Sequence, residues 1–531
     1  MPEPFRIDFE PLGRRGQARR GQTLLEAAQS AGVGLASVCG GIGTCEECRV
    51  RVVSGRLTPP SLVEEAVLSK ADLSSGVRLA CQAEPLSDVK LDIPPESLTA
   101  EQRLQLDGEE IQLELRPAIR KQGAYGLAVD IGTTKLAAYL VDLNTGVTVA
   151  RAGAMNPQIA FGEDVISRIA YAGREPGGAK KLQSVLMETL NSLLAGMCSE
   201  AKVTPDSVLD AVLVGNTAMH HLFAGLPVEQ LGHAPFKPAT TKPLAIPAVE
   251  LGLNLGFGAN VYLPPVIAGY VGADHVAMLL ATDAWRSSGN IIALDIGTNT
   301  EISLVANGKV TCCSCASGPA FEGAHIHEGM RAAPGAIERA RWSEGKILWQ
   351  TIENQPPVGI CGSGILDVVA SLLDGGLVKP TGALKTDSAA GYVLVQAAQT
   401  GLGRALMVTR KDINEIQLAK SAIRAAVEIL LEESGLRSSD LDSFIVAGAF
   451  GTYLDLRSAV HIGMFPPLPL ETFRQVGNSA GVGAKQMLVS LDKRQEAEQL
   501  ASQVGYVELT SRPAFTSLFM KHLSFQVLEE K

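Results

Sequence analysis

One pattern occurs twice in this chain and constrains its fold more than any other feature. An apolar strand leads into Asp130-Ile131-Gly132-Thr133-Thr134-Lys135 and a second strand follows, and the same arrangement surrounds Asp295-Ile296-Gly297-Thr298-Asn299. A single such turn indicates little, because turns often use these residues. Two copies in register, each between apolar strands, predict two halves of similar fold rather than a solenoid.

The chemistry that suits these turns is phosphate binding. Glycine lacks a Cβ, so the backbone N–H groups of the turn can approach an anion, and the hydroxyl side chains donate further hydrogen bonds. Asp130 and Asp295 can hold Mg²⁺ directly or through water and are the candidate catalytic carboxylates, with Asp274 as a third candidate. Lys135 either contacts phosphate or leaves the hairpin toward solvent. The candidate nucleotide-binding residues of the two turns are Gly132, Thr133, Thr134, Lys135, Gly297, Thr298 and Asn299.

Four cysteines near the N-terminus predict an iron–sulfur site. Cys39, Cys45 and Cys48 lie in a glycine-rich stretch with C-x5-C-x2-C spacing, and Cys81 follows downstream. Four thiolates are the ligands of a [2Fe–2S] cluster, and this spacing resembles that of the adrenodoxin-like ferredoxins. Zinc is the alternative, but zinc ribbons usually bring two C-x2-C pairs, and here the fourth cysteine stands alone. We therefore expect a one-electron carrier.

The segment around these cysteines, residues 1–95, has the pattern of one small domain. Its expected elements are a strand over 5–9, a helix over 23–31 capped by Thr23 and Glu26, a strand over 48–53, a helical piece over 62–70 and a strand over 89–93. This order resembles the β-grasp ferredoxins. Residues 96–123 form a polar linker with one strand-like stretch, 111–115.

The composition of the chain excludes several functional classes. With 531 residues, 46% of them hydrophobic, there is room for several cores. A formal net charge of -10 without a basic run argues against a nucleic-acid partner. The start of the chain lacks the apolar core of a signal peptide, and no apolar segment approaches membrane-spanning length without a charge or a glycine cluster. Nine cysteines, an odd number with four in a cluster pattern, suit a reducing compartment, so we expect a cytoplasmic protein.

A third glycine turn completes a nucleotide-binding pattern. An apolar strand runs into Gly448 and Gly451 after an expected helix over 412–435, and two connecting segments precede it, one at Asn216-Thr217 and one at 359–365. These five pieces in this order resemble the superfamily of acetate and sugar kinases, heat-shock chaperone ATPases and actin. That resemblance implies two ribonuclease-H-like halves that close around ATP and Mg²⁺. It adds to the candidate nucleotide-binding residues Asn216, Thr217, Gly448 and Gly451.

A ferredoxin segment fused to such an ATPase is a specific combination. Together with the stretches 156–168, 269–274 and 317–323, it resembles the reductive activators of corrinoid proteins over nearly the whole chain. The resemblance implies that single electrons pass through the cluster and return cob(II)amide on a partner protein to cob(I)amide, with hydrolysis of ATP. The implied partners are a corrinoid protein or methyltransferase and an upstream electron donor. A homodimer stays open, because the linker has no room for the further segment that many members carry.

The expected architecture is therefore multidomain, combining α+β and α/β parts. Residues 1–95 form the β-grasp [2Fe–2S] ferredoxin domain, 96–123 the linker, 124–290 the first half of the ATPase, and 291–531 its second half with a C-terminal tail.

Two other functions stay open at this point. Activators of 2-hydroxyacyl-CoA dehydratases are also electron-passing ATPases of this superfamily, but they place their cluster cysteines within the ATPase domain and lack a ferredoxin part. A redox-sensing binding module would use ATP only as a conformational switch.

Other chemically notable residues receive structural interpretations. Cys312, Cys313, Cys315 and Cys361 have no standard cluster spacing and are expected to be buried thiols. The histidines at 220, 221, 325 and 327 are expected to be core or solvated rather than metal ligands. Residues 314–322, just after the second phosphate hairpin, are the expected partner-facing surface.

Overall fold

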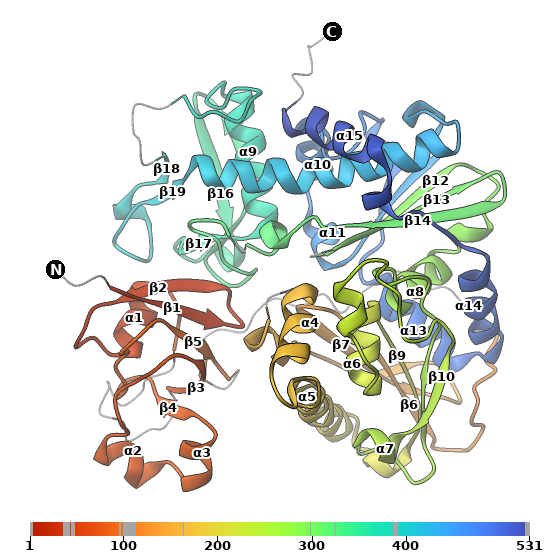
Figure 1. Cartoon of the computed structure of the whole chain (residues 1–531), viewed down its shortest axis with the longest axis horizontal. Helices are drawn as coiled ribbons and strands as arrows, with labels where there is room; N and C mark the ends of the chain where they lie inside the picture. The colour runs from red at the N-terminus through yellow and green to blue at the C-terminus, as the bar shows by residue number, and fades with distance from the viewer. Residues whose placement is uncertain are drawn as a thin grey trace. The chain divides into compact units, whose positions relative to one another are not determined.

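The computed structural model describes residues 4–35, 43, 48–94, 97–98, 113–162, 164–297, 299–323, 325–385 and 391–525. The chain forms two compact units (Figure 1). Unit 1 combines Met1–Arg103 with Pro319–Gln417, and unit 2 combines Leu104–Gly318 with Leu418–Lys531. The N-terminal segment therefore shares a unit with a segment from the second half of the chain. Among the residues described, no helix has both the length and the apolar character needed to cross a membrane.

Unit 2 contains two sheets that share an arrangement of five strands, with a sixth strand added at a different edge in each. Their orders are β10-β11-β9-β6-β7-β8 and β21-β20-β12-β13-β14-β22. In each, three consecutive antiparallel strands carry the hairpin, and a later strand joins the first of them in parallel. The duplication expected from the sequence is confirmed. The strands are β6 (Tyr125–Ile131), β7 (Lys135–Asp142), β8 (Thr148–Met155), β9 (Val208–Gly215), β10 (Leu244–Pro247), β11 (Asn260–Leu263), β12 (Ile291–Ile296), β13 (Thr300–Ala306), β14 (Lys309–Cys315), β20 (Ser443–Ala447), β21 (Phe473–Gln475) and β22 (Gly505–Tyr506).

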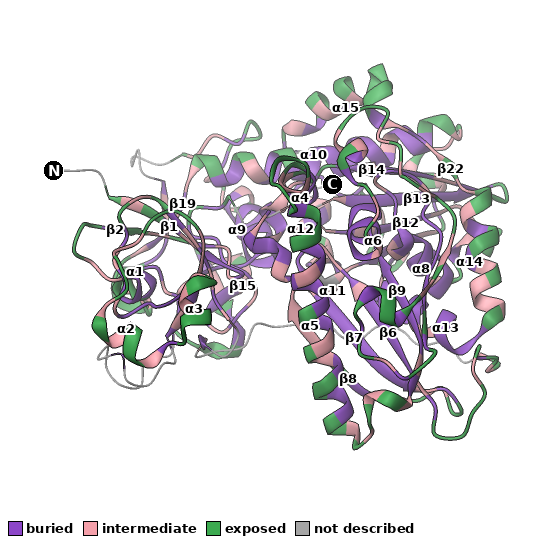
Figure 2. Ribbon diagram, turned by 60° about the horizontal axis from the view of Figure 1, so that its bottom comes forward, coloured by how far each residue is buried: buried purple, intermediate pink, exposed green. Residues whose placement is uncertain are grey.

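A single hydrophobic core joins these two sheets. It contains residues of β6 and β12 together with residues of the helices α8 and α13. The two helices approach closely, because a Cβ on Gly483 of α13 would lie 2.1 Å from the carbonyl oxygen of Ala277 in α8. Strands β6, β9, β12 and β13 are buried along most of their length (Figure 2). The helices of unit 2 are α4 (Val165–Arg174), α5 (Gly178–Ala201), α6 (Thr217–Ala224), α7 (Ala248–Leu251), α8 (Ala273–Thr282), α11 (Ala449–Tyr453), α12 (Leu456–His461), α13 (Ser479–Val489), α14 (Leu491–Gln503) and α15 (Pro513–Leu523).

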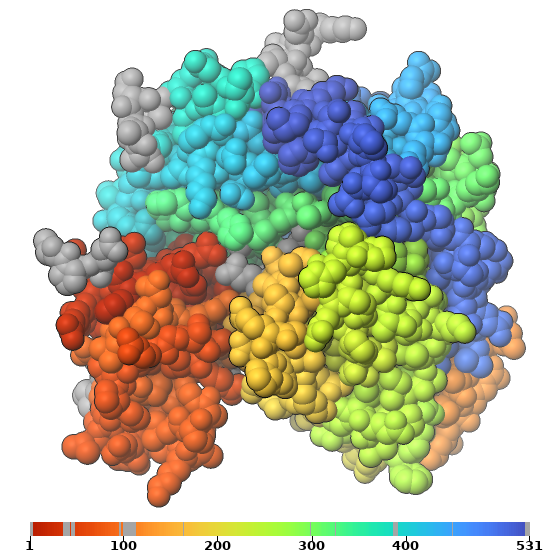
Figure 3. Space-filling view, viewed as in Figure 1, coloured from red at the N-terminus to blue at the C-terminus, as the bar shows by residue number. Residues whose placement is uncertain are grey.

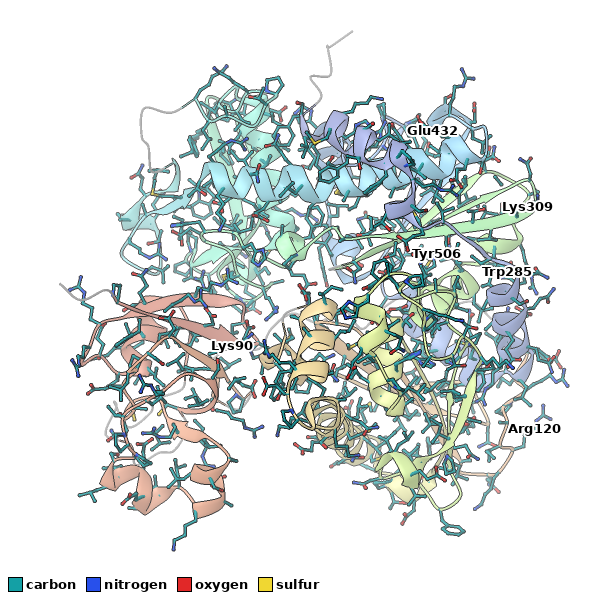
Figure 4. The ribbon with its side chains drawn as sticks, viewed as in Figure 1. Lys90, Arg120, Trp285, Lys309, Glu432 and Tyr506 are labelled. Atoms are coloured by element: carbon teal, nitrogen blue, oxygen red, sulfur yellow. The ribbon has the colours of Figure 1, made fainter. Side chains whose placement is uncertain are left out.

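The outer edge of the second sheet shows how the C-terminal segment is attached. Tyr506 of β22 pairs with Cys312 of β14, and Figure 4 labels both Tyr506 and Lys309, where β14 begins. The Tyr506 hydroxyl donates to Glu508 at 3.0 Å. The returning chain thus covers part of the edge of β14.

Unit 1 contains the N-terminal sheet, with strand order β2-β1-β5-β3-β4, and a smaller group of elements from residues 319–417. Helix α10 (Arg410–Glu433) begins in this unit and continues into unit 2. The remaining elements are β1 (Phe5–Glu10), β2 (Arg14–Ala18), β3 (Arg49–Ser54), β4 (Val77–Leu79), β5 (Val89–Asp92), β15 (Ala336–Ser343), β16 (Lys346–Thr351), β17 (Gly359–Ile360), β18 (Tyr392–Val395) and β19 (Leu406–Val408), with α1 (Leu24–Ser30), α2 (Leu62–Val67), α3 (Lys70–Ser74) and α9 (Gly362–Asp374).

Local predictions for the N-terminal domain are mostly confirmed. The Thr23 hydroxyl accepts from the Glu26 N–H at 3.2 Å and the Glu26 carboxylate accepts from the Thr23 N–H at 2.9 Å, which is the expected capping box. The single helical piece expected over 62–70 is instead two helices, α2 and α3, because Ser69 caps a new turn. The strand expected over 111–115 is wrong over its described part, 113–115, which carries no strand.

Candidate nucleotide and cluster sites

Four acidic residues of unit 2 gather between its two sheets. Asp130 and Asp295 lie near the C-terminal ends of β6 and β12, and Asp274 lies in the first turn of α8. Glu301 of β13 pairs directly with Asp295 across the hairpin, so these two side chains share a face of the sheet. The sequence analysis did not single out Glu301. The predicted hairpin could have indicated it, because Glu301 is the residue that pairs with Asp295 on the second strand.

The pKa values of these carboxyl groups are raised. Burial, helped by the neighbouring Asp295, raises the pKa of Asp130 to about 7, and a hydrogen bond from Asn478 opposes this rise. Burial raises the pKa of Asp295 to about 6. Burial and the neighbouring carboxylates also raise the pKa values of Asp274 and Glu301. As anions the four groups repel one another, so the site favours a bound cation.

The same carboxyl groups do not form a complete metal cage. Among the described residues, no three acidic, histidine or cysteine side chains are placed to hold a metal ion together. Mg²⁺ in nucleotide sites usually takes one or two carboxylates, several waters and the phosphate oxygens. The donors present therefore fit a magnesium–nucleotide complex better than a metal bound by protein alone.

Asn156 and Arg168 hold the turn of the first hairpin through hydrogen bonds to its carbonyl oxygens. Asn156 donates from Nδ2 to the Gly132 oxygen and from its backbone N–H to the Thr134 oxygen, both at 2.8 Å. The fully buried Arg168 donates from Nη2 to the Thr133 oxygen. These bonds to the carbonyl groups fix the conformation of the turn, and a fixed turn is what an anion site built from backbone N–H groups requires.

The side chain of Asn216 connects this hairpin to the first connecting segment. Its Nδ2 donates to the Thr133 hydroxyl at 2.9 Å, while its Oδ1 caps helix α6 by accepting from the Met219 N–H at 3.0 Å. Thr217 is fully buried and donates to the Ala268 oxygen at 2.6 Å. A Cβ on Gly272 would lie 2.4 Å from Asn216 Cα, so glycine lets the α8 N-terminus approach this turn.

The second hairpin is tied to the residues that follow β14. The Ser317 hydroxyl donates to the Gly297 oxygen at 3.1 Å and lies 2.8 Å from the Thr300 hydroxyl. Ser317 is only 4% exposed, so the expectation that it faces a partner protein is wrong. That expectation rests on the position of Ser317 after the hairpin in sequence, whereas its hydroxyl turns back onto the hairpin. Thr298 lies outside the described residues.

The third glycine turn lies directly against Asp295, the second candidate carboxylate. Gly448 has a φ of +90°, and a Cβ there would lie 2.5 Å from Asp295 Oδ1. A side chain at this position would therefore displace the carboxylate. The structure brings the candidates Asp130, Asp295 and Gly448 together; a role for Lys135 and Gly451 stays a prediction.

The cluster site is described in part. Cys48 precedes β3 and Cys81 follows β4, and the Ala80 N–H donates to the Cys48 oxygen at 2.9 Å, which brings the two cysteines to one end of the strand pair. Both thiols are buried. Gln82 donates from Nε2 to Cys81 Sγ at 3.6 Å. Two buried thiols beside an amide donor fit half of a four-thiolate cluster, in which such donors adjust the potential. Cys39 and Cys45 lie outside the described residues.

The other cysteines have the buried surroundings that the sequence predicted. Cys312, Cys313 and Cys315 lie on β14, and burial raises the pKa of each thiol above its ordinary value. Burial likewise raises the pKa of Cys361. Burial therefore favours the neutral thiol form of these groups.

The histidines also match their expected structural roles. The rings of His220 and His221 are buried in α6, with their Nδ1 atoms 3.2 Å apart. Burial lowers the pKa of His220 to about 3 and that of His221 to about 4. His325 is partly exposed, while His327 contacts Glu328 at 3.3 Å.

Comparison with known proteins agrees with this assembly of sites. Three family models match: the 2Fe-2S iron-sulfur cluster binding domain over residues 8–86, the RACo middle region over 125–287, and the C-terminal, ASKHA domain of RACo over 289–531. Corrinoid activation enzyme RamQ of Eubacterium limosum is 34% identical over 76% of this chain and 71% of its own. A [Co(II) methylated amine-specific corrinoid protein] reductase of Methanosarcina barkeri is 26% identical over 76% of this chain and 77% of its own.

A solved structure extends the likeness to the whole chain. The reductive activator for corrinoid, iron-sulfur protein is 31% identical, covers 98% of both chains and superposes with a TM-score of 0.70. The N-terminal cluster domain and the duplicated ATPase fold expected from the sequence are thereby confirmed. The chain belongs to the RACo family of reductive activators of corrinoid proteins.

Proposed function

We propose that this protein is an ATP-dependent reductive activator of a corrinoid protein. Single electrons pass through a [2Fe–2S] cluster held by Cys39, Cys45, Cys48 and Cys81 and return the partner's cob(II)amide to cob(I)amide. One observation carries the proposal: the same chain contains buried cysteines in a ferredoxin-type domain and two hairpins of the kind that bind nucleotide phosphates. Relatives over most of the chain are named corrinoid activation enzyme and corrinoid protein reductase.

The nucleotide site would act through the carboxyl groups of unit 2. We infer that the two hairpins bind the phosphates of ATP, that Asp130 and Asp295 hold Mg²⁺ directly or through water, and that Asp274 orients the attacking water. The cluster supplies one-electron transfer when bound. Coupling to ATP has an energetic reason: an input on the order of 10 kcal/mol moves a one-electron step by roughly 0.4 V.

The alternative activator of a 2-hydroxyacyl-CoA dehydratase has less support. Such proteins carry their cluster cysteines within the ATPase domain, whereas the described cysteines of that region here are buried thiols with raised pKa values. The N-terminal match to a 2Fe-2S domain supports the corrinoid activator instead. We further propose that the protein works in the cytoplasm with an upstream electron donor.

The proposed function is tested by following cob(I)amide absorbance in a mixture of the protein and a cob(II)amide-loaded corrinoid protein. We expect cob(I)amide to accumulate only when reductant, cluster-loaded protein and MgATP are all present, and we expect the partner to stimulate ATP hydrolysis. Equally fast accumulation without ATP would overturn the proposal, and the protein would then be a simple ferredoxin. Hydrolysis without any corrinoid reduction would support the nucleotide-switched binding module.

Replacing Arg168 by methionine is expected to weaken ATP binding. The variant loses the donors to the Thr133 and Gly162 oxygens inside a fully buried site, so the hairpin is no longer held in its anion-binding form. Removing a buried charged donor costs about 3 kcal/mol of stability. We expect a KM for ATP raised about tenfold or more, with partial recovery in Arg168→Lys. Arg174→Met on the same helix, where the side chain is 74% exposed, is the matched control.

The stability of the nucleotide-free protein is expected to fall as pH rises from about 4 to 7. In this window the folded protein binds more protons than the unfolded chain, because the pKa values of Asp130 and Asp295, about 7 and about 6, exceed their ordinary value of 3.8. For Asp130 the loss is on the order of 4 kcal/mol. Urea unfolding at both ends of the window, with and without Mg²⁺ and an ATP analogue, measures it. The variant carrying Asp130→Asn and Asp295→Asn should lose the part of this slope that these two groups contribute, while the raised pKa values of Asp274 and Glu301 maintain the rest. An unchanged slope would contradict the assignment.

A further inference from the structure

The N-terminal domain contacts residues 319–417 within unit 1 through its β1–β2 hairpin. Glu10, at the end of β1, is 2% exposed and Arg14, at the start of β2, is 5% exposed. Charged side chains at the edge of a small domain are normally solvated, and their burial is tolerated only with partners. In the space-filling view the red residues of this hairpin lie against green and cyan residues of the 319–417 segment (Figure 3).

Both residues have side-chain partners in the 319–417 segment. Arg331 Nη1 lies 3.2 Å from Glu10 Oε2, and these two side chains are 6% and 2% exposed. Arg14 donates from Nη1 to the Gly329 oxygen at 3.3 Å and from Nη2 to the Val358 oxygen. Here we call these interactions the hairpin contact.

Two further charged residues, Glu328 and Arg404, interact with each other near Arg14. Glu328, which is 2% exposed, accepts from Arg404 Nη1 at 2.6 Å and from Nη2 at 2.9 Å, and its charge favours the cationic form of Arg14. Burial lowers the pKa of Arg14 to about 10, so the guanidinium remains charged at neutral pH. A Cβ on Gly359 would lie 2.8 Å from Arg14 Nη1, so the guanidinium fills its site closely.

The strand order places this contact and the cluster cysteines on opposite edges of the N-terminal sheet. In the sheet β2-β1-β5-β3-β4, the hairpin forms one edge, while Cys48 and Cys81 adjoin β3 and β4 at the other. Figure 1 shows β1 and β2 on the side of the domain that faces β17, with β3 and β4 away from it. The hairpin contact therefore lies on the β1–β2 edge of the sheet, and Cys48 and Cys81 adjoin its β3–β4 edge.

We propose that residues 319–417 are a permanent docking site for the cluster domain and bind its β1–β2 hairpin. In this arrangement the edge of the sheet that adjoins Cys48 and Cys81 stays accessible to electron donor and acceptor proteins. Electrons then enter and leave while the domain stays docked. The docking itself is independent of which corrinoid protein the activator serves.

A single substitution in the Glu10–Arg331 ion pair is expected to break the hairpin contact, and a second substitution in the same pair is expected to restore it. Removing one member of a buried ion pair leaves an uncompensated charge and is strongly unfavourable, whereas replacing both members by apolar residues is often neutral. Arg331→Met should therefore release the domain, and adding Glu10→Leu should restore docking. Arg6→Met is the matched control, because it is also an arginine-to-methionine change and Arg6 lies on β1, the strand of Glu10, with a 62% exposed side chain.

Docking is measured in the full chain by the distance between two nitroxide labels. Leu62→Cys on α2, where leucine is 85% exposed, and Lys346→Cys, at an exposed position of β16, carry the labels; the other described cysteines are buried. We expect one narrow distance in the parent and the Arg6→Met control, a broad distribution in Arg331→Met, and a narrow one again in the double variant. A broad distribution in the parent, or a narrow one in Arg331→Met, would overturn the proposal.

The open cluster edge is measured by electron transfer to cytochrome c. The cluster is reduced with dithionite, excess reductant is removed, and one electron passes from each reduced chain to one ferric haem in a stopped-flow mixer. We expect equal rates in the parent and in Arg331→Met, with unchanged cluster absorbance in both. A rate several-fold higher in Arg331→Met would show that docking covers the cluster and would overturn this half of the proposal.

Discussion

Replacing Cys81 by alanine is expected to abolish one-electron reduction of this protein and, with it, all formation of cob(I)amide. Cys81 is a buried thiol that accepts a hydrogen bond from Gln82 beside Cys48, and a four-thiolate cluster has no substitute for a missing ligand at this position. The expected readouts are loss of the S = ½ signal of the reduced protein and loss of both irons per chain. Basal ATP hydrolysis should persist, since the nucleotide site lies in unit 2.

The matched control for this variant is Cys198→Ala. Cys198 is also buried, but it belongs to α5 and packs in the core of unit 2 with residues of the first sheet. It should keep the full iron content and the full signal. Zinc without iron in the parent protein, or an unaltered signal in Cys81→Ala, would contradict the cluster assignment.

The second large effect is expected at the carboxylates of the nucleotide site. Changing Asp130 or Asp295 to asparagine should lower ATP hydrolysis by about 10²- to 10⁴-fold, the usual contribution of a group that moves a proton or positions water. The cluster spectrum should not change. Asp283→Asn is the control, because Asp283 follows α8 with a 55% exposed side chain.

The position of Gly448 gives an independent check of the same site. Because a Cβ there would lie 2.5 Å from Asp295 Oδ1, Gly448→Ala should reproduce much of the Asp295→Asn defect without touching a carboxyl group. If the double variant Asp130→Asn, Asp295→Asn hydrolysed ATP at the parent rate, the catalytic assignment of both residues would fail.

Features that depend on neighbours in sequence were determined by the sequence alone. Each phosphate hairpin is a strand, a turn and a strand, so the order of apolar and turn residues is enough to place Asp130 and Asp295 at strand ends. The Thr23–Glu26 capping box spans one helical turn and is equally readable. The duplicated topology follows because both copies keep this local pattern.

Only the tertiary structure decided which distant groups support these motifs. Asn156 and Arg168 engage the first hairpin from other elements, and Asn478 reaches Asp130 from the N-terminus of α13. Ser317 follows the second hairpin in sequence, yet its side chain folds back onto that hairpin. Burial also sets the charge of the site, since the raised pKa values depend on how completely the two sheets exclude water.

The association of the N-terminal domain with residues 319–417 is likewise a tertiary property. Nothing in the local pattern around Glu10 or Arg14 distinguishes them from surface charges, because the groups that desolvate and pair them lie some 300 residues away in sequence. A sequence specifies hairpins and caps through contacts between near neighbours. Pairing between distant charges becomes defined only when packing has removed them from water, where an unpaired charge is too costly to keep.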